Sequence, residues 1–482
     1  MLENLALIAS TALIVRHLPK LRQWKLPVHV GGYVKPGFEE VEDEFRRNFE
    51  KGPEVRKSGS GFAVYHNGER VVNLYGGYAD ADILQLWREN TLSLVYSTTK
   101  VIGAICIAKL VDEGLLDYQR PVADYWPEFG AHGKDEITVQ QLMEHKAALP
   151  VIPLPITYGL LRDHVKLGSL FADMSPSWKP GTAHGYHAVS IGPLTSELLR
   201  RVDPKGRTLG KYFDEEIAKP FGIDFFIGLP LEENHRTAKL ICADPGPVVT
   251  YRSVRHSSKN RTATTGSMKD ITYAKKLVQN AGELRDFFRT QNNPEYRAVE
   301  IASANGFGTA EALAKLMGIL AVGGTDPITK KALLSKERVD SFLDSEPETT
   351  DKVIKIPIAW KNGMAIDHTE VRGDSPFSNS VLKFLFRVPF HKGLETVFAP
   401  MLDHLVSSLS SCEQWREAIR PDLALTLTIF FSMLPQYAHG ECTECIYISV
   451  PEQMGKSSTS TGYVPKQWSG WFSFVRCRPC LS

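Results

Sequence analysis

The run from Val101 to Leu110 is almost entirely apolar, and it directly follows a Ser-x-x-Lys motif formed by Ser97 and Lys100. A helix over this run would be apolar on every side from residue 101 to residue 108, so it is expected to lie buried in the core. Gly114 comes shortly afterwards and predicts the C-terminal cap of the helix. The other elements of the chain must therefore be built around a central buried helix that begins near Ser97.

Ser97 and Lys100 are candidate catalytic residues because they are spaced for one face of that helix. Residues three apart on a helix are neighbours, so Lys100 is expected to lie beside Ser97. A serine hydroxyl becomes a nucleophile when a neighbouring base takes its proton, and a helix N-terminus favours developing negative charge. The pattern has only two fixed positions, and Ser97 could instead serve only as an N-cap.

The charge balance narrows the classes of partner. The chain has 482 residues, 43% of them hydrophobic, which is enough for a large core. Its 56 basic and 55 acidic residues give a formal net charge of +1. Because there is no basic excess to hold a phosphate backbone, no nucleic-acid partner is expected.

The N-terminal segment leaves several interpretations open. Its apolar stretch, residues 5–15, is too short for a comfortable membrane span, and no basic region precedes it. An uncleaved anchor, an atypical mitochondrial presequence and a plain buried helix all fit this pattern. Membrane association through the N-terminus and a membrane-bound, secretory or mitochondrial location therefore remain open.

Turn and capping signals predict several further elements. A β-hairpin is predicted over residues 61–77, because Asn67-Gly68 is a strong two-residue turn signal. We also predict a helix over residues 38–49, a second helix over residues 309–320 and a returning strand over residues 351–360.

Five segments, the Ser-x-x-Lys motif among them, follow the order found in a known superfamily. They are Ser97-Thr98-Thr99-Lys100, Leu110 to Asp117, Ile137 to Leu142 with Leu149-Pro150, Trp178 to Tyr186, and Pro220 to Ile223. In these segments the chain resembles the serine β-lactamase and penicillin-binding-protein superfamily. The likeness is closest to the class C and esterase-like branch, which includes mitochondrial β-lactamase-like proteins of animals, and it covers roughly residues 55–365.

The resemblance implies an α/β (α+β) fold of the β-lactamase/transpeptidase type. Such a fold has an antiparallel sheet with flanking helices plus a helical lobe, here about residues 130–330, with the active site between them. The corresponding domain is expected over residues 55–375, after an N-terminal lead-in over residues 1–54. Residues 376–482 are expected to form a divergent C-terminal region.

The resemblance also assigns a third candidate residue, Tyr186. In this branch the tyrosine of the second motif is paired with the motif lysine as the base, and Tyr186 occupies that position. The alternative is a buried tyrosine satisfied by one hydrogen bond. Ala188 stands where the family often has asparagine, which is closer to esterase-like members and argues against efficient β-lactam turnover.

The third motif of the family, His or Lys followed by x-Gly on a strand beside the site, has no clear copy. The candidates are Lys361-Asn362-Gly363 and His391-Lys392-Gly393, and each is expected to be a surface loop. Two C-x-x-C pairs, Cys442/Cys445 and Cys477/Cys480, could hold zinc, but the spacer between them is longer than usual. No metal or cofactor is therefore predicted.

Two functions follow as hypotheses. The first is a serine hydrolase that acts on an ester or amide of a small molecule or peptide through an acyl-enzyme at Ser97. The alternative is a catalytically weakened relative that acts as a self-assembling structural or membrane-associated protein. The resemblance allows this, because animal mitochondrial members of the branch form filaments, and a homo-oligomer therefore remains open.

Overall fold

The computed structural model describes residues 26–51, 59–240, 272–342, 344, 347–355, 357–366 and 428–432. The apolar N-terminal stretch, His391-Lys392-Gly393 and both C-x-x-C pairs lie outside these residues. Within them, no helix has the length and hydropathy needed to cross a membrane.

The strands are β1 (Val30–Val34), β2 (Gly59–His66), β3 (Glu69–Asp80), β4 (Gln85–Leu86), β5 (Ser93–Leu94), β6 (Phe225–Ile227), β7 (Gly306–Gly308), β8 (Thr349–Thr350), β9 (Pro357–Lys361), β10 (Met364–Ile366) and β11 (Thr428–Ser432). The helices are α2 (Glu39–Glu50), α3 (Thr99–Asp112), α4 (Val139–Met143), α5 (Tyr158–Arg162), α6 (His164–Asp173), α7 (Ile191–Val202), α8 (Leu209–Phe213), α9 (Lys219–Phe221), α11 (Thr272–Gln279), α12 (Phe287–Thr290), α13 (Pro294–Arg297), α14 (Ala310–Ala321) and α15 (Lys336–Asp340).

The largest sheet is antiparallel, with strand order β1-β3-β2-β11 and β4 paired to β3. Its central hairpin, β2–β3, confirms the prediction for residues 61–77. Asn67 and Gly68 form the turn with φ values of 50° and 76°. Positive φ at both positions is the geometry of a type I′ turn, which is why Asn-Gly suits it.

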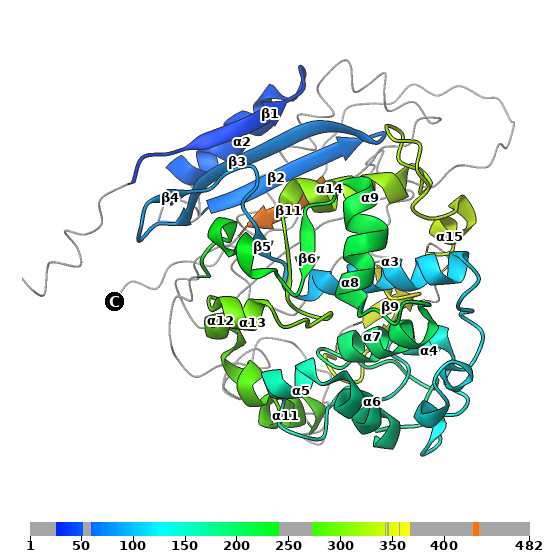
Figure 1. Cartoon of the computed structure of the whole chain (residues 1–482). Helices are drawn as coiled ribbons and strands as arrows, with labels where there is room; N and C mark the ends of the chain where they lie inside the picture. Colours follow the sequence, from blue (N-terminus) through cyan, green and yellow to red (C-terminus); the bar gives the residue numbers. More distant parts are fainter. Residues whose placement is uncertain are drawn as a thin grey trace, which may run out of the picture.

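Helices cover both faces of this sheet, as Figure 1 shows. The α2 helix, predicted at residues 38–49, packs on one face through a cluster that includes Phe62 and Val64 of β2. The alternate β2 residues, Ala63 and Tyr65, join the main core on the α14 side. Because successive side chains of a strand point to opposite faces, both sets are buried.

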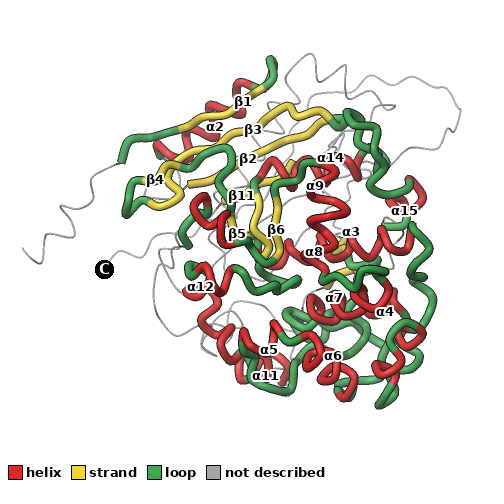
Figure 2. Tube along the Cα trace, in the orientation of Figure 1, coloured by secondary structure: helices red, strands yellow, loops and turns green. Residues whose placement is uncertain are grey.

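The predicted buried helix is α3, which lies between the sheet and the helical part of the molecule (Figure 1). Its residues from Thr99 to Ala108 are all buried, and Gly114 follows its end with φ of 73°. Figure 2 shows the strands of the main sheet on one side of α3 and most of the helices on the other. The arrangement is thus an antiparallel sheet with flanking helices plus a helical part, as expected from the sequence.

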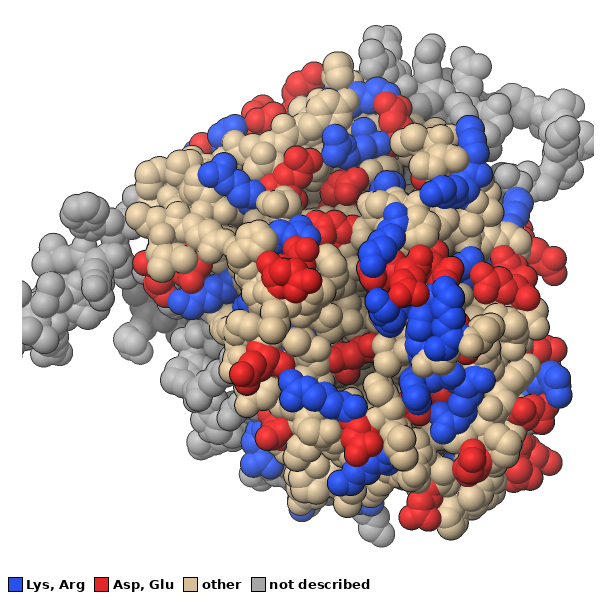
Figure 3. Space-filling model, in the orientation of Figure 1, with Lys and Arg blue, Asp and Glu red and all other residues tan. Residues whose placement is uncertain are grey.

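Other predicted elements differ in detail. The helix predicted over residues 309–320 is α14, whose N-cap is Thr309. The strand predicted over residues 351–360 is shorter, because β9 begins at Pro357. Asp351 instead begins a turn in which its carboxylate accepts hydrogen bonds from the backbone N–H groups of Val353 and Ile354. On the face shown in Figure 3, basic and acidic side chains of the described residues are interspersed.

Candidate active site

Ser97 stands in a tight turn between β5 and α3. The turn is a 3₁₀ segment, Tyr96–Thr98, and Tyr96 adopts a positive φ of 42°, which is unusual for a residue with a side chain. The Thr99 hydroxyl links this turn to β7, because it donates to the Tyr96 carbonyl and accepts from the Gly306 N–H at 2.8 Å. Ser97 is half-buried, so its hydroxyl combines a fixed backbone with access for a ligand.

Lys100 lies beside Ser97, as the spacing predicted. Its Nζ is 3.2 Å from Ser97 Oγ and also donates to the Ala188 and Ser303 carbonyls at 2.9 and 2.7 Å. In the described part of the chain, none of its polar contacts is a carboxylate. Burial lowers the pKa of Lys100 to about 7, because a charged ammonium is poorly solvated in this position.

Tyr186 reaches the same serine from the other side. Its hydroxyl donates to Ser97 Oγ at 2.8 Å, so the structure brings all three predicted residues together. Its ring is stacked on Trp360, with centroids 6.1 Å apart and planes 11° apart, and lies 4.9 Å from Lys100 Nζ. Burial raises the pKa of Tyr186, so the phenol is held in its protonated form.

Two buried histidines, His145 and His187, lie next to Tyr186. His145 packs edge-on against the Tyr186 ring at 5.3 Å, and its Nδ1 accepts from the His187 N–H. Burial keeps the pKa of His145 well below its usual range, which agrees with an acceptor nitrogen that carries no proton. The His145 and His187 rings are both buried, and their described contacts are with other residues of the protein.

None of the described hydrogen bonds of Ser97 involves the third-motif candidate Lys361-Asn362-Gly363, although Gly363 lines the same small cavity as Lys100. This segment forms the turn between β9 and β10, with φ of 50° at Asn362 and 93° at Gly363. A side chain at Gly363 would clash with Ala104 of α3, so this turn packs on the central helix. The expectation of a surface loop was therefore wrong for this candidate. The second candidate, at residues 391–393, lies outside the described residues.

Three residues that support the candidate catalytic residues were given no role from the sequence: Thr99, Asp351 and Trp360. Thr99 belongs to the motif itself, and its second hydrogen-bond partner, Gly306, is distant in sequence. Asp351 accepts the backbone N–H of Tyr186 at 2.8 Å, although the two residues are 165 positions apart. A single sequence carries no signal for such long-range pairs.

Comparisons with known proteins agree with this geometry. The chain matches the beta-lactamase family over residues 45–367. It is 32% identical over 341 residues to the esterase/beta-lactamase LipL of Mycobacterium tuberculosis, across 69% of this chain and 74% of that protein. A penicillin-binding protein homologue from Caulobacter crescentus is 34% identical with a TM-score of 0.59, across 74% of this chain and 87% of that one. A family VIII carboxylesterase is 31% identical with a TM-score of 0.62, across 80% of this chain and 100% of that one.

Fold and relatives together define a serine hydrolase of the β-lactamase/transpeptidase-like class. Within that class, the chain belongs to the beta-lactamase family.

Proposed function

We propose that this protein hydrolyses esters of small molecules through an acyl-enzyme at Ser97. The observation that carries the proposal is the convergence of two groups on one oxygen. Lys100 Nζ and Tyr186 OH lie 3.2 and 2.8 Å from Ser97 Oγ. A base and a second proton-carrying group within hydrogen-bond reach are what a serine nucleophile needs.

The contacts of Lys100 support its role as the base. A neutral amine has two N–H donors and one lone pair, and the Ala188 and Ser303 carbonyls can only accept. The two N–H groups therefore point to the carbonyls, which leaves the lone pair for the Ser97 hydroxyl. A pKa of about 7 lets a large share of the molecules hold this neutral form at neutral pH.

The proposed reaction has two halves. Ser97 Oγ attacks the ester carbonyl while its proton passes to Lys100 Nζ. The proton held by Lys100 then passes, with the help of the Tyr186 hydroxyl, to the oxygen of the departing alcohol as the ester C–O bond breaks. The acyl group stays on Ser97 Oγ. Water then attacks the acyl carbon through the same groups in reverse. The Ser97 N–H, in the first turn before α3, stabilises the oxyanion.

Esters are favoured over β-lactams as substrates by the position of Ala188. Its carbonyl contacts Lys100, and its methyl side chain offers no amide group where the family often has asparagine. Among the relatives, one is named as an esterase/beta-lactamase and one as a carboxylesterase. We therefore expect faster turnover of p-nitrophenyl esters than of nitrocefin.

Covalent labelling tests the nucleophile. A fluorescent fluorophosphonate is expected to label the wild-type protein, and Ser97→Ala is expected to abolish both labelling and p-nitrophenyl butyrate hydrolysis. Ser169→Ala is the matched control, because Ser169 lies on the exposed surface of α6 and donates to a carbonyl of its own helix. Labelling of Ser97→Ala at the wild-type level would show that the nucleophile is another residue.

A further inference from the structure

Asp351 is a fully buried carboxylate directly behind the second motif. Its side chain is 0% exposed, and its Oδ1 accepts from the Val353 and Ile354 N–H groups at 2.7 and 2.8 Å. Its Oδ2 accepts from the Tyr186 N–H at 2.8 Å. Among the described ion pairs, its partner is His184, whose Nε2 is 3.7 Å from Oδ2. Burying a carboxylate without a close cation costs free energy, and the hydrogen bonds from three backbone N–H groups offset that cost for Asp351.

The backbone around Tyr186 is held at three consecutive N–H groups. The Gly185 N–H donates to the His145 carbonyl at 3.0 Å, and the His187 N–H donates to His145 Nδ1 at 3.1 Å. Asp351 takes the central one, that of Tyr186 itself. The Lys352 N–H also donates to the His184 carbonyl at 3.0 Å, so the turn after β8 is joined to the second motif by two hydrogen bonds.

This anchoring bears directly on the site. The phenol hydroxyl lies at the far end of a long rigid side chain, so a small rotation of the Tyr186 backbone displaces it from Ser97 Oγ. A misplacement of about 1 Å in a reacting group is enough to slow a reaction about 10²-fold. We propose that Asp351 is a positioning residue that fixes the Tyr186 hydroxyl against Ser97 through the Tyr186 N–H. The inference rests on the proposed function, because it requires that this hydroxyl takes part in turnover.

Asp326 provides a matched control within the same chain. It is also buried, and its Oδ1 accepts from the N–H groups two and three residues ahead, those of Ile328 and Thr329. Its Oδ2, however, accepts from the Thr329 hydroxyl, so this carboxylate serves only its own turn. The two aspartates therefore share a local structure and differ in whether the second oxygen reaches the candidate active site.

The experiment compares Asp351→Ser and Asp351→Asn with Asp326→Ser and Asp326→Asn in ester hydrolysis. A serine can still cap its own turn but is too short to reach Tyr186. An asparagine can keep Oδ1 but places an NH₂ group, which cannot accept, at the position of Oδ2. Both Asp351 variants are expected to lose up to about 10²-fold in kcat, because the Tyr186 hydroxyl would be misplaced, with KM changed much less. Both Asp326 variants are expected to keep the wild-type kcat.

A double-variant cycle separates positioning from a general structural effect. If Asp351 acts through the Tyr186 hydroxyl, Asp351→Ser should cost nothing further in a Tyr186→Phe background, because groups that act as a unit are non-additive. If Asp351→Ser does not fold, Asp351→Asn carries the same cycle, with circular dichroism to confirm that each variant is folded.

The outcomes are distinguishable. A slow Tyr186→Phe beside a fully active Asp351→Ser or Asp351→Asn would overturn the positioning role alone, as would a full additional loss in the double variant. Wild-type turnover in Tyr186→Phe would instead remove Tyr186 from the proposed function, and the role of Asp351 with it. Non-additive losses at both residues, with active Asp326 variants, would support the proposal.

Discussion

At the scale of single residues, the charge of Lys100 controls when Ser97 becomes a nucleophile. Burial lowers the pKa of Lys100 to about 7, and only the neutral amine can take the serine proton. We therefore predict that kcat/KM for an ester rises with pH through an apparent pKa of about 7. A simple titration then leaves roughly a tenth of the maximum rate at about one pH unit below that value. Initial rates between pH 5 and pH 9 would measure this profile.

Two comparisons make this titration specific to Lys100. Lys100→Arg keeps a positive charge across the whole range, so it is expected to be inactive at every pH tested. If a Tyr186 phenolate were the base, the rate would rise only under alkaline conditions, because burial raises the pKa of Tyr186. A profile that is flat from pH 5.5 to pH 8.5 would contradict a neutral lysine base.

At the scale of elements, the turn between β5 and α3 sets the position of the nucleophile. The Thr99 side chain is fully buried and bonds both the Tyr96 carbonyl and the Gly306 N–H. Thr99→Val keeps the shape but removes the acceptor of the Gly306 N–H, whereas the Tyr96 carbonyl still accepts from the Thr99 backbone N–H, so the variant is expected to cost about 1–3 kcal/mol of stability. It should also lower kcat by about tenfold or more, since Ser97 would shift.

The conservative variant supplies the control for this turn. Thr99→Ser keeps the hydroxyl and loses only a methyl group, so it is expected to restore most of the turnover lost in Thr99→Val. Thermal melts and ester kinetics on the same samples would separate stability from catalysis. A Thr99→Val protein with the wild-type kcat would show that the hydroxyl does not position Ser97.

The elements that could be predicted from the sequence are those encoded by short-range chemistry. The β2–β3 hairpin follows from Asn67-Gly68, and the buried helix α3 follows from an apolar run that ends before a glycine with positive φ. That Lys100 lies beside Ser97 follows from helical spacing alone. Tyr186 was found only through the order of family motifs, because nothing local in its segment indicates a contact with Ser97.

The features that could not be predicted depend on contacts between distant segments. The β9 strand begins later than predicted, because Asp351 bonds its own turn and the Tyr186 backbone instead of continuing an extended chain. Trp360 looks like an ordinary strand residue in the sequence, yet its ring stacks on Tyr186. The Lys361-Asn362-Gly363 turn was expected to be a surface loop, whereas the structure packs it on α3.

At the scale of the whole molecule, α3 contacts both the candidate active site and a large ion-pair network. Its N-terminal end carries the Ser97 turn, and its 14 residues correspond to about 21 Å of helix. The hypothesis of a self-assembling protein with weakened catalysis stays a prediction, because the structure describes a single chain. Size-exclusion chromatography and negative-stain microscopy of an active sample would test it.

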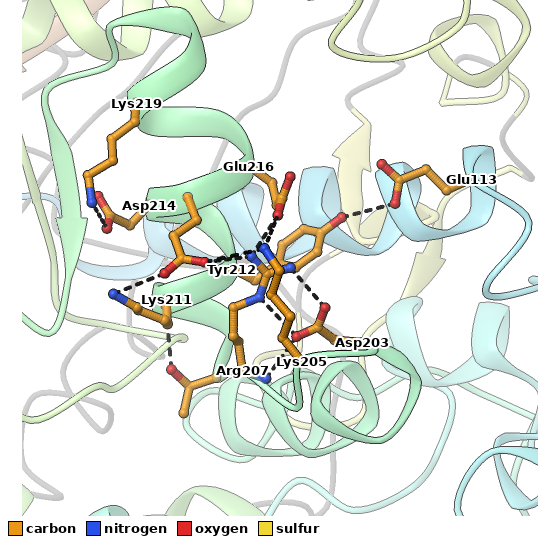
Figure 4. A network of polar contacts seen from close by, with 11 residues as sticks. Glu113, Asp203, Lys205, Arg207, Lys211, Tyr212, Asp214, Glu216 and Lys219 are labelled. Atoms are coloured by element: carbon orange, nitrogen blue, oxygen red, sulfur yellow. Dashed lines mark hydrogen bonds and ion pairs between the residues drawn. The ribbon is translucent and has the colours of Figure 1, made fainter.

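This network is centred on Arg207 and reaches Glu113, just after α3, through Tyr212, as Figure 4 shows. The guanidinium bonds both carboxylate oxygens of Asp203 at 2.8 and 2.9 Å and also contacts Glu215 and Glu216 at 2.8 and 2.6 Å. It lies over the Tyr212 ring at 4.9 Å, and the Tyr212 hydroxyl donates to Glu113 just after α3. The cluster thus joins the ends of α3, α7 and α8.

Removing Arg207 should therefore change stability and leave the chemistry intact. Arg207→Met removes the guanidinium from buried Asp203 and leaves this carboxylate with backbone N–H donors, so we expect the free energy of unfolding at pH 7 to fall by about 2–4 kcal/mol. The kcat of the folded variant should stay within about twofold of the wild-type value, since the described side-chain contacts of Arg207 include none with Ser97, Lys100 or Tyr186. Urea unfolding followed by circular dichroism would measure the difference.

Acid should erase this difference in stability. Hydrogen bonds from Arg207 lower the pKa values of Asp203, Glu215 and Glu216 in the folded state. Carboxylates with lowered pKa values stabilise the fold above their unfolded pKa values, which lie near about 4, and lose that contribution as the pH falls through the folded values. The unfolding curves of wild type and Arg207→Met should therefore differ fully at pH 7 and pH 5 and converge below about pH 4. A gap that stays constant down to pH 3 would show that Arg207 stabilises the fold through its packing on Tyr212 rather than through these carboxylates.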